Sequence, residues 1–181
     1  MLRVPPGAGT RPTGDRAREG LFNTLASVVG DLTGLRFLDL YAGSGAVGLE
    51  ALSRGAGHVL FVESAPKAAR VLRDNVEALK LPGAVVRTEP VARVVAAPAP
   101  APYDVVFADP PYAAPAAELT EVLRLMVAGG WIATTTVVAV ERSSRDDDWS
   151  WPPPLEPLRS RRYGDTTLWY GRAASATQAT T

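Results

Sequence analysis

The chain has 181 residues, of which 46% are hydrophobic and 21% charged, so its composition is that of an ordinary globular protein with one core. Nineteen basic residues balance nineteen acidic ones, which excludes a strong overall field for a polyanion and leaves any nucleic-acid binding to a local patch. The sequence has no cysteine and one histidine, His58, which excludes thiol chemistry and argues against a histidine-based metal site or triad.

No apolar run approaches the roughly 20 residues that a membrane-spanning helix needs, and the first residues lack the apolar core of a signal peptide. We therefore expect a cytoplasmic monomer with no membrane partner and no bound metal. We divide the chain into an N-terminal segment, 1–13, one domain, 14–172, and a disordered tail, 173–181.

The first predicted elements are a helix and then a strand, a glycine turn and a second helix. Thr13 is expected to cap the helix over about 14–29, which carries one apolar stripe. The apolar run 35–41 predicts a strand that ends in the turn 42–45. A helical pattern resumes there and stops at Gly55.

The alternation of strands and helices continues along the chain. We predict Ser64 as the cap of a helix that has Pro66 in its first turn. The other predicted elements are strands at 58–63, 84–88 and 103–108, a loop at 96–102, a helix at 116–128, a strand within 131–142, and a turn that feeds a terminal strand within 161–170. This order indicates an α/β fold with a mostly parallel sheet and right-handed crossovers.

The glycine turn has a pattern that is typical of nucleotide-binding proteins. The glycines at 43, 45 and 48 satisfy G-x-G-x-x-G between a strand and a helix, and Glu63 follows the first glycine by twenty positions at the end of the next strand. Glycines let a ligand approach the backbone, and the carboxylate can accept both hydroxyls of a ribose. A nucleoside-containing cofactor is the expectation, and a tight turn with a surface glutamate is the alternative.

Asp39 favours one cofactor over another. A carboxylate four residues before Gly43 would repel a pyrophosphate in a low-dielectric site, but it would attract the cationic end of S-adenosylmethionine. We therefore favour the methyl donor over a dinucleotide. A cap of a helix or turn is the alternative role for Asp39.

A second motif, Asp109-Pro110-Pro111-Tyr112, ends the predicted strand 103–108, and open parallel sheets bind ligands at such strand ends. Asp109 and the Pro110 carbonyl could accept the two N–H bonds of an exocyclic amino group, while Tyr112 offers a stacking face for a base. The prolines would fix the turn. In the alternative interpretation they only end a strand, and the tyrosine packs on a loop.

These motifs resemble those of class I methyltransferases, and more closely those of the RsmD family, over roughly residues 2–172. The similarity lies in four blocks of this sequence: R-P-T-G-D-R-A-R-E-G-L-F-N from Arg11, F-L-D-L-Y-A-G-S-G-A-V-G-L-E-A-L-S-R-G-A from Phe37, V-E-S from Val62 and V-F-A-D-P-P-Y from Val106. The resemblance implies a Rossmann-like, mostly parallel seven-stranded sheet, with helices on both faces and an antiparallel C-terminal strand. The family carries a Gly/Arg-rich hairpin before the segment that matches Leu2 to Pro6, and its absence here leaves the RNA affinity open.

The resemblance also implies an activity and a set of site residues. The family transfers a methyl group from S-adenosylmethionine to the N2 amino group of one guanine in 16S ribosomal RNA, as bare RNA or in an assembled small subunit. The implied catalytic residues are Asp109, Pro110, Pro111 and Tyr112. The implied cofactor-binding residues are Asp39, Tyr41, Ala42, Gly43, Ser44, Gly45, Glu63, Ser64 and Glu89, the last in a segment that departs from the usual D-A pair.

Two groups of arginines could contact phosphates of an RNA. The group near the first helix, Arg11, Arg16 and Arg18, is the one we assign to nucleic-acid binding, although an ion pair is the alternative for Arg18. The group 159–162 is equally consistent with a solvated face. The alternatives for the whole protein are an adenine-N6 or protein-glutamine methyltransferase, a nicotinamide-dependent oxidoreductase, and a non-catalytic rRNA-binding factor.

Overall fold

The computed structural model describes residues 12–145 and 149–174. Its helices are α1 (Pro12–Val29), α2 (Ala46–Ser53), α3 (Pro66–Leu79), α4 (Val91–Val95) and α5 (Ala116–Ala128). Its strands are β1 (Arg36–Leu40), β2 (His58–Val62), β3 (Ala84–Arg87), β4 (Tyr103–Ala108), β5 (Ile132–Ser143), β6 (Leu155–Tyr163) and β7 (Thr166–Ala173). They form one seven-stranded sheet in the order β3-β2-β1-β4-β5-β7-β6.

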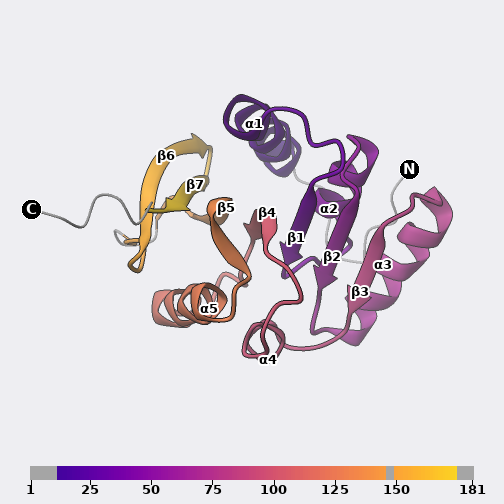
Figure 1. The fold of residues 1–181 in the computed structure, drawn as a ribbon. Coiled ribbons are helices and arrows are strands. Elements are labelled where there is room, and N and C mark those ends of the chain that lie inside the picture. The colour runs from indigo at the N-terminus through magenta and orange to yellow at the C-terminus, as the bar shows by residue number, and fades with distance from the viewer. Residues whose placement is uncertain (1–11, 146–148, 175–181) are drawn as a thin grey trace, which may run out of the picture.

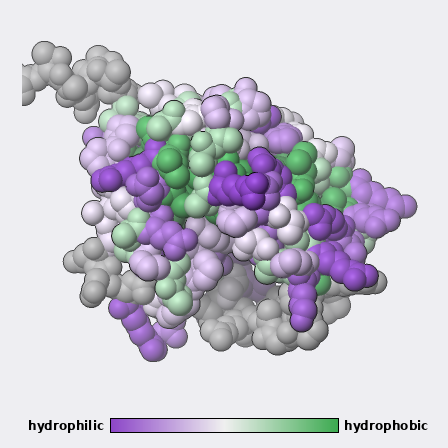
Figure 2. Space-filling model, turned by 90° about the horizontal axis from the view of Figure 1, so that it is seen from below, coloured by the Kyte–Doolittle hydropathy of each residue, from purple (hydrophilic) through white to green (hydrophobic). Residues whose placement is uncertain are grey.

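Helices cover both faces of this sheet (Figure 1). Side chains of α1, α2 and α3 pack with one face, in a core that includes Phe22, Leu49 and Leu72. Side chains of α4 and α5 pack with the other face, in a core that includes Val94 and Leu123. The surface on the lower side of Figure 1, which Figure 2 shows, has hydrophobic and hydrophilic residues interspersed.

The strand directions confirm the predicted fold. Strands β1 to β5 are parallel to one another, and β7 runs antiparallel to both β5 and β6. The central strands β1 and β4 are buried over most of their length, because helices cover both faces of the sheet there. In the C-terminal hairpin, Gly164 has φ +59, a value that suits the two-residue turn between β6 and β7.

Strand register brings the two predicted motifs to one edge of the sheet. Leu40 at the end of β1 pairs with Val62 on one side and with Ala108 on the other. The glycine turn, Glu63 and Asp109 follow these three strand ends directly. The carboxyl end of the sheet is therefore the place where a ligand is expected to bind.

Several predicted boundaries are wrong. Helix α1 begins at Pro12, whose fixed φ suits a first helical position, so Thr13 lies inside the helix instead of capping it. Ala65, and not Ser64, is the N-cap of α3, since Oε1 of Glu63 accepts the Ala65 N–H at 2.7 Å and sets the backbone there. Pro66 is the first helical residue, as predicted.

Some elements and one end of the chain were not predicted correctly. The sequence predicted neither the short helix α4 in the middle of the chain nor the strand β6 near its end. The predicted tail 173–181 is wrong at its start, because Ala173 ends β7 and the Ala174 N–H donates to the Pro154 carbonyl at 2.8 Å. Residues 175–181 and most of the predicted segment 1–13 lie outside the described residues.

The described residues contain neither a candidate membrane-spanning helix nor a candidate metal site. Among 12–145 and 149–174, no helix is long and apolar enough to cross a membrane. In the same part of the chain, no group of three or more His, Cys, Asp or Glu side chains is placed to hold a metal ion.

Candidate active site

The motif after β4 lines a cavity of about 400 Å³ at the carboxyl edge of the sheet. Pro110 is buried and anchors the turn, whereas Tyr112 is 78% exposed at the rim. The Tyr112 hydroxyl lies 2.6 Å from Oγ of Ser143, which joins the motif to the end of β5. The lining residues are Gly14, Asp109, Pro110, Pro111, Tyr112, Glu141, Arg142, Ser143, Asp165 and Thr166. The structure therefore brings the four predicted catalytic residues together around one space.

Asp109 shares this space with a second carboxyl group, that of Glu141. Burial among protein atoms raises the pKa of Asp109 above its ordinary value, and the negative charge of Glu141 raises it further. Part of Asp109 faces the open cavity, so water reduces both effects. Burial also raises the pKa of Glu141, although a hydrogen bond from Thr166 opposes that shift. Both carboxyl groups are therefore better proton acceptors than ordinary carboxylates.

The three glycines of the first motif have different roles. Gly43 has φ +56, and a Cβ there would meet no atom within 4 Å. A Cβ on Gly45 would lie 2.2 Å from Leu72, and one on Gly48 would lie 2.3 Å from Phe61. Gly45 and Gly48 are therefore required by packing of the protein itself, while Gly43 leaves open space beside the turn for a ligand.

Glu63 and Asn75 hold the glycine turn in place. Oε2 of Glu63 accepts the Gly43 N–H at 2.8 Å, and its other oxygen accepts the Ala65 N–H. From α3, Nδ2 of the buried Asn75 donates to the Ser44 carbonyl at 3.0 Å. The carboxylate of Glu63 is thus fixed next to the turn, and its remaining lone pairs are available to hydroxyl groups.

Asp39 is 2% exposed and lies beneath the turn. Its Oδ2 accepts the Gly48 N–H at 2.9 Å, so it caps the first turn of α2. Burial raises the pKa of Asp39, the hydrogen bond from Gly48 lowers it, and the charges of Asp109 and Glu63 raise it, with a net value of about 8. The capping role considered for Asp39 is present, and the same carboxyl, mostly protonated at neutral pH, can ionise when a cationic ligand binds beside it.

The remaining predicted cofactor residues lie around the turn at different depths. Tyr41 has φ +59, and burial together with the nearby Glu118 raises its pKa to about 12. The Ala42 N–H donates to the Val62 carbonyl at 3.0 Å, and Ser64 is exposed. Glu89 forms ion pairs with Arg87 and Arg93, so its carboxylate already has partners.

The two motifs are joined through adjacent strands. The Asp109 N–H points to the Leu40 carbonyl at 3.5 Å, and the charge of Asp109 is close enough to raise the pKa of Asp39. Within the described residues, the two cavities that Asp109 lines do not include Gly43 or Glu63. The motifs therefore lie at the same edge of the sheet and within electrostatic reach of each other, although neither of these two cavities extends to the glycine turn.

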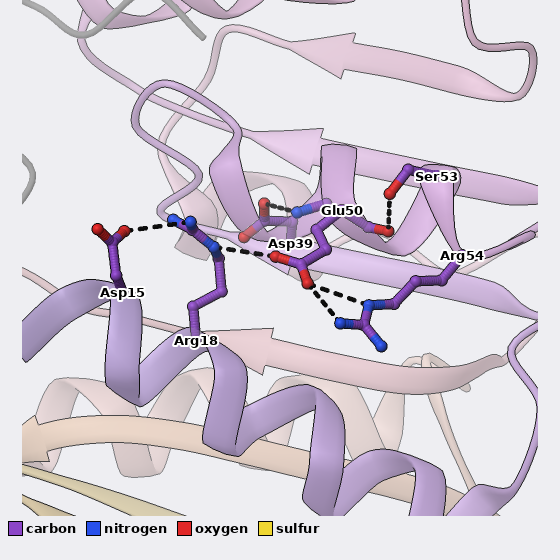
Figure 3. A network of polar contacts seen from close by, with 7 residues as sticks. Asp15, Arg18, Asp39, Glu50, Ser53 and Arg54 are labelled. Carbon is purple, nitrogen blue, oxygen red and sulfur yellow. Dashed lines mark hydrogen bonds and ion pairs between the residues drawn. The ribbon is translucent and has the colours of Figure 1, made fainter. Parts of the chain in front are cut away.

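The arginines assigned to nucleic-acid binding are placed differently from one another. Arg11 lies outside the described residues. Arg18 has the alternative role considered for it, because its guanidinium donates to Glu50 at 2.9 Å and to Asp15 at 3.1 Å (Figure 3). Glu50 also pairs with Arg54 at 2.7 Å, so this network links α1 to α2.

Arg16 lies in a groove of about 530 Å³ between α1 and β6. The groove also contains Arg159 and Arg161, which alternate along β6 and so share one face of that strand. Tyr163 continues the groove toward the hairpin turn, which borders the cavity of Asp109. Arg16 of the first arginine group thus meets Arg159 and Arg161 of the second on one surface beside the candidate catalytic residues.

Two functional candidates were not predicted from the sequence. Glu141 follows the apolar run Val137–Val140 within β5, and a polar residue directly after such a run is the signal that could have found it. Asn75 is a buried polar residue three positions after Leu72 on the apolar stripe of α3. Both positions break an apolar pattern, and both side chains turn toward the site.

Comparison with known proteins agrees with this geometry. The family model described as "Conserved hypothetical protein 95" matches residues 1–172. Ribosomal RNA small subunit methyltransferase D of Escherichia coli is 39% identical over 140 residues, which cover 77% of this chain and 68% of the relative.

Solved structures give the same result for the fold. The Escherichia coli protein yhhF superposes with a TM-score of 0.81 and 31% identity, covering 96% of this chain and 92% of that one. Magnesium protoporphyrin IX methyltransferase from Synechocystis, solved with bound SAM, has a TM-score of 0.67 at 13% identity over 93% of this chain and 87% of that one, which supports the fold alone. The match of the family model and the identity to the Escherichia coli relative show that this chain belongs to the RsmD family.

Proposed function

We propose that this protein transfers a methyl group from S-adenosylmethionine to the N2 amino group of a guanine in 16S ribosomal RNA. The Escherichia coli relative is named as a small-subunit ribosomal RNA methyltransferase, which supports the reaction class. The observation that carries the proposal is the position of Asp109 and Pro110 at the end of β4, next to the end of β1 from which the glycine turn starts. A cytoplasmic location is part of the proposal, because ribosomal RNA is the substrate.

The residues at the glycine turn fit the proposed cofactor. Open space above Gly43 admits a ligand, and Glu63 is fixed where its oxygens can accept ribose hydroxyls. The carboxyl groups of Glu63 and Asp109 lie close enough to Asp39 to raise its pKa. Carboxyl groups gathered in this way favour a cationic ligand, because its charge lowers their pKa values and stabilises their ionised forms, and they oppose a pyrophosphate. When bound, S-adenosylmethionine supplies a methyl group made electrophilic by its sulfonium.

The chain's own residues would then orient the base. The lone pair of an exocyclic amino group is delocalised into the ring, so the amino group needs acceptors for its N–H bonds before it can attack. Asp109 and the Pro110 carbonyl supply those acceptors, each worth about 1.5–3 kcal/mol if charge-assisted. Alignment of the reacting atoms can contribute about 7–11 kcal/mol, so positioning is the larger effect.

Two further steps involve residues of the cavity. The base must leave its stack to reach Asp109, as enzymes that act on bases require, and Tyr112 at the rim can stack on it. As the nitrogen gains the methyl group it must lose one proton. Asp109 can take that proton, since its raised pKa makes it a better base than an ordinary aspartate.

Labelled methyl transfer tests the proposal. Small subunits that lack the modification, bare 16S rRNA and DNA are each incubated with S-adenosylmethionine and either wild type or Asp109→Ala, and the product nucleosides are identified. We expect N2-methylguanosine with wild type and a loss of at least 100-fold with the variant. N6-methyladenosine or methylglutamine would instead identify the nearest alternatives, and binding of a dinucleotide without S-adenosylmethionine would identify an oxidoreductase.

A further inference from the structure

Glu141 lies beside Asp109 at the candidate active site. The register of β4 and β5 pairs Ala108 with Val140, so Asp109 and Glu141 are the next residues on two adjacent strands. Both line the cavity of about 400 Å³ and also the smaller neighbouring one. Glu141 is therefore positioned to touch a base that Asp109 holds.

The alternation of β5 directs Glu141 to the side of the sheet that α1 covers. Val137 and Ala139, four and two positions earlier, pack in the core of that side, and Val138 and Val140 pack in the other core. Thr166 on the hairpin lines the same cavity, and its side chain opposes the rise in the pKa of Glu141. The remaining charged groups around the two cavities are Asp15, Arg18, Arg142 and Asp165.

A carboxylate at this position can distinguish guanine from adenine by the hydrogens on the ring edge. Guanine carries an N1–H beside its N2 amino group, so both groups donate in the same direction. Adenine and 2,6-diaminopurine have a bare N1, whose lone pair would face the carboxylate. Since a site built to accept a hydrogen bond strongly rejects an analogue that lacks the donor, one carboxylate is enough for selection.

We propose that Glu141 selects the target base, with its carboxylate accepting the N1–H of guanine while Asp109 and the Pro110 carbonyl hold the N2 amino group. The inference rests on the proposed function and names the substrate contact of the same cavity. It assigns the two carboxyl groups different tasks. Asp109 holds the reacting amino group, and Glu141 reads the adjacent ring position.

The test uses small subunits reconstituted with rRNA that carries either guanine or 2,6-diaminopurine at the methylated position. Both bases offer a 2-amino group, but only guanine has the N1–H. Wild type is expected to prefer guanine by about 10- to 100-fold in kcat/KM, the size of one charge-assisted hydrogen bond. Glu141→Gln can donate its amide N–H to the bare N1, so its preference should shift toward 2,6-diaminopurine by at least tenfold.

Glu141→Asp serves as the matched variant, because it keeps the charge on a shorter side chain. It should retain the preference for guanine even if its overall rate falls, and the ratio of two substrates is unaffected by a loss of folded enzyme. An unchanged guanine preference in Glu141→Gln would overturn the inference. If that variant does not fold, loss of the guanine preference in Glu141→Asp, or equal rates of wild type on the two bases, would also overturn it.

The two proposals fail in different ways. If wild type forms no N2-methylguanosine on unmodified subunits, the proposed function is wrong, and the inference about Glu141 falls with it. If wild type forms N2-methylguanosine and Glu141→Gln keeps the same ratio of guanine to 2,6-diaminopurine, only the inference is wrong.

Discussion

The backbone N–H of Gly48 donates to Oδ2 of Asp39 across 2.9 Å, which ties the end of β1 to the first turn of α2. The same carboxyl group is buried near Asp109 and Glu63, and its pKa is raised to about 8. A single side chain thus caps a helix and can supply a negative charge when a cationic cofactor binds beside it. The two roles can be separated, because an amide can accept the hydrogen bond but cannot carry the charge.

Replacement of Asp39 by Asn and by Ala should separate these roles. Asn keeps an acceptor for the Gly48 N–H, so we expect a melting temperature close to that of wild type. Ala leaves that N–H unpaired, which should lower the free energy of unfolding by about 1–3 kcal/mol. The melting temperature should fall by about 2–4 °C for each kcal/mol lost. Both variants should bind S-adenosylmethionine about tenfold more weakly by calorimetry, which corresponds to about 1.4 kcal/mol. Wild-type affinity in Asp39→Asn would show that the charge has no role.

The pH dependence of stability should also report on Asp39. Its folded pKa of about 8 lies above the unfolded value near 3.8, so between them the folded state holds a proton that the unfolded state has lost. The resulting stability is present in full below the unfolded pKa and is lost as pH rises through about 8. Relative to Asp39→Asn, the free energy of unfolding of wild type should fall by about 1.4 kcal/mol for each pH unit in this window. Urea unfolding of both proteins from pH 5 to pH 8 measures it, and parallel curves would contradict it.

Much of the fold and both motifs could be predicted because short-range patterns determine them. The apolar run 103–108 and the helix 116–128 were predicted with their observed bounds, since burial on a sheet and helical periodicity leave direct traces in the sequence. Ser64 was assigned as a cap from residue type alone. The sequence could not show that the Glu63 carboxylate takes the Ala65 N–H instead.

The parts of the site that were missed depend on contacts between distant segments. Glu141 becomes a neighbour of Asp109 only through the register of β4 with β5. Arg16 meets Arg159 only because α1 packs beside the C-terminal hairpin. A single sequence carries no record of either contact, although a polar residue after an apolar strand was a usable signal for Glu141.

The glycines of the turn should respond differently to alanine. In Gly43→Ala the methyl group meets open space, so the cost is about 1–2 kcal/mol for a left-handed backbone, but the methyl group would occupy the proposed cofactor space. In Gly48→Ala the Cβ would lie 2.3 Å from the buried Phe61, which should destabilise the fold by about 1–3 kcal/mol or more. We expect Gly43→Ala to lose S-adenosylmethionine binding at least tenfold while it stays folded.

Gly130→Ala is the matched control for Gly43→Ala. Gly130 also has a positive φ, +73, and a Cβ there would meet no atom within 4 Å, but it precedes β5 at the other end of the sheet. Its stability cost should equal that of Gly43→Ala, measured by urea unfolding, with unchanged affinity for S-adenosylmethionine. Equal loss of affinity in both variants would mean that backbone strain, and not the space above Gly43, is responsible.

The groove between α1 and β6 should bind RNA phosphates. Replacement of Arg16, Arg159 and Arg161 by Gln, one at a time, should raise the KM for the RNA substrate. We expect little change in kcat, because these side chains line the groove and not the catalytic cavity beside it. Each lost phosphate contact should reduce the slope of log K against log salt by about 1. Arg124→Gln is the control, since this exposed residue is on α5, a helix that packs on the opposite face of the sheet. A uniform effect of all four variants would indicate a change in net charge alone.

Tyr112 should contribute by stacking on the extruded base. Tyr112→Ala should lose a stacking energy of about 1–3 kcal/mol, so kcat/KM should fall by about 5- to 150-fold. Tyr112→Phe keeps the ring and loses only the contact with Ser143. Because the side chain is 78% exposed, neither change should move the melting temperature by more than about 1–2 °C. With 2-aminopurine at the target position, fluorescence should be quenched by stacking in wild type and in Tyr112→Phe, and should stay high in Tyr112→Ala. Equal quenching in all three proteins would place the base away from Tyr112 and would leave the ring with a role only at the rim of the cavity.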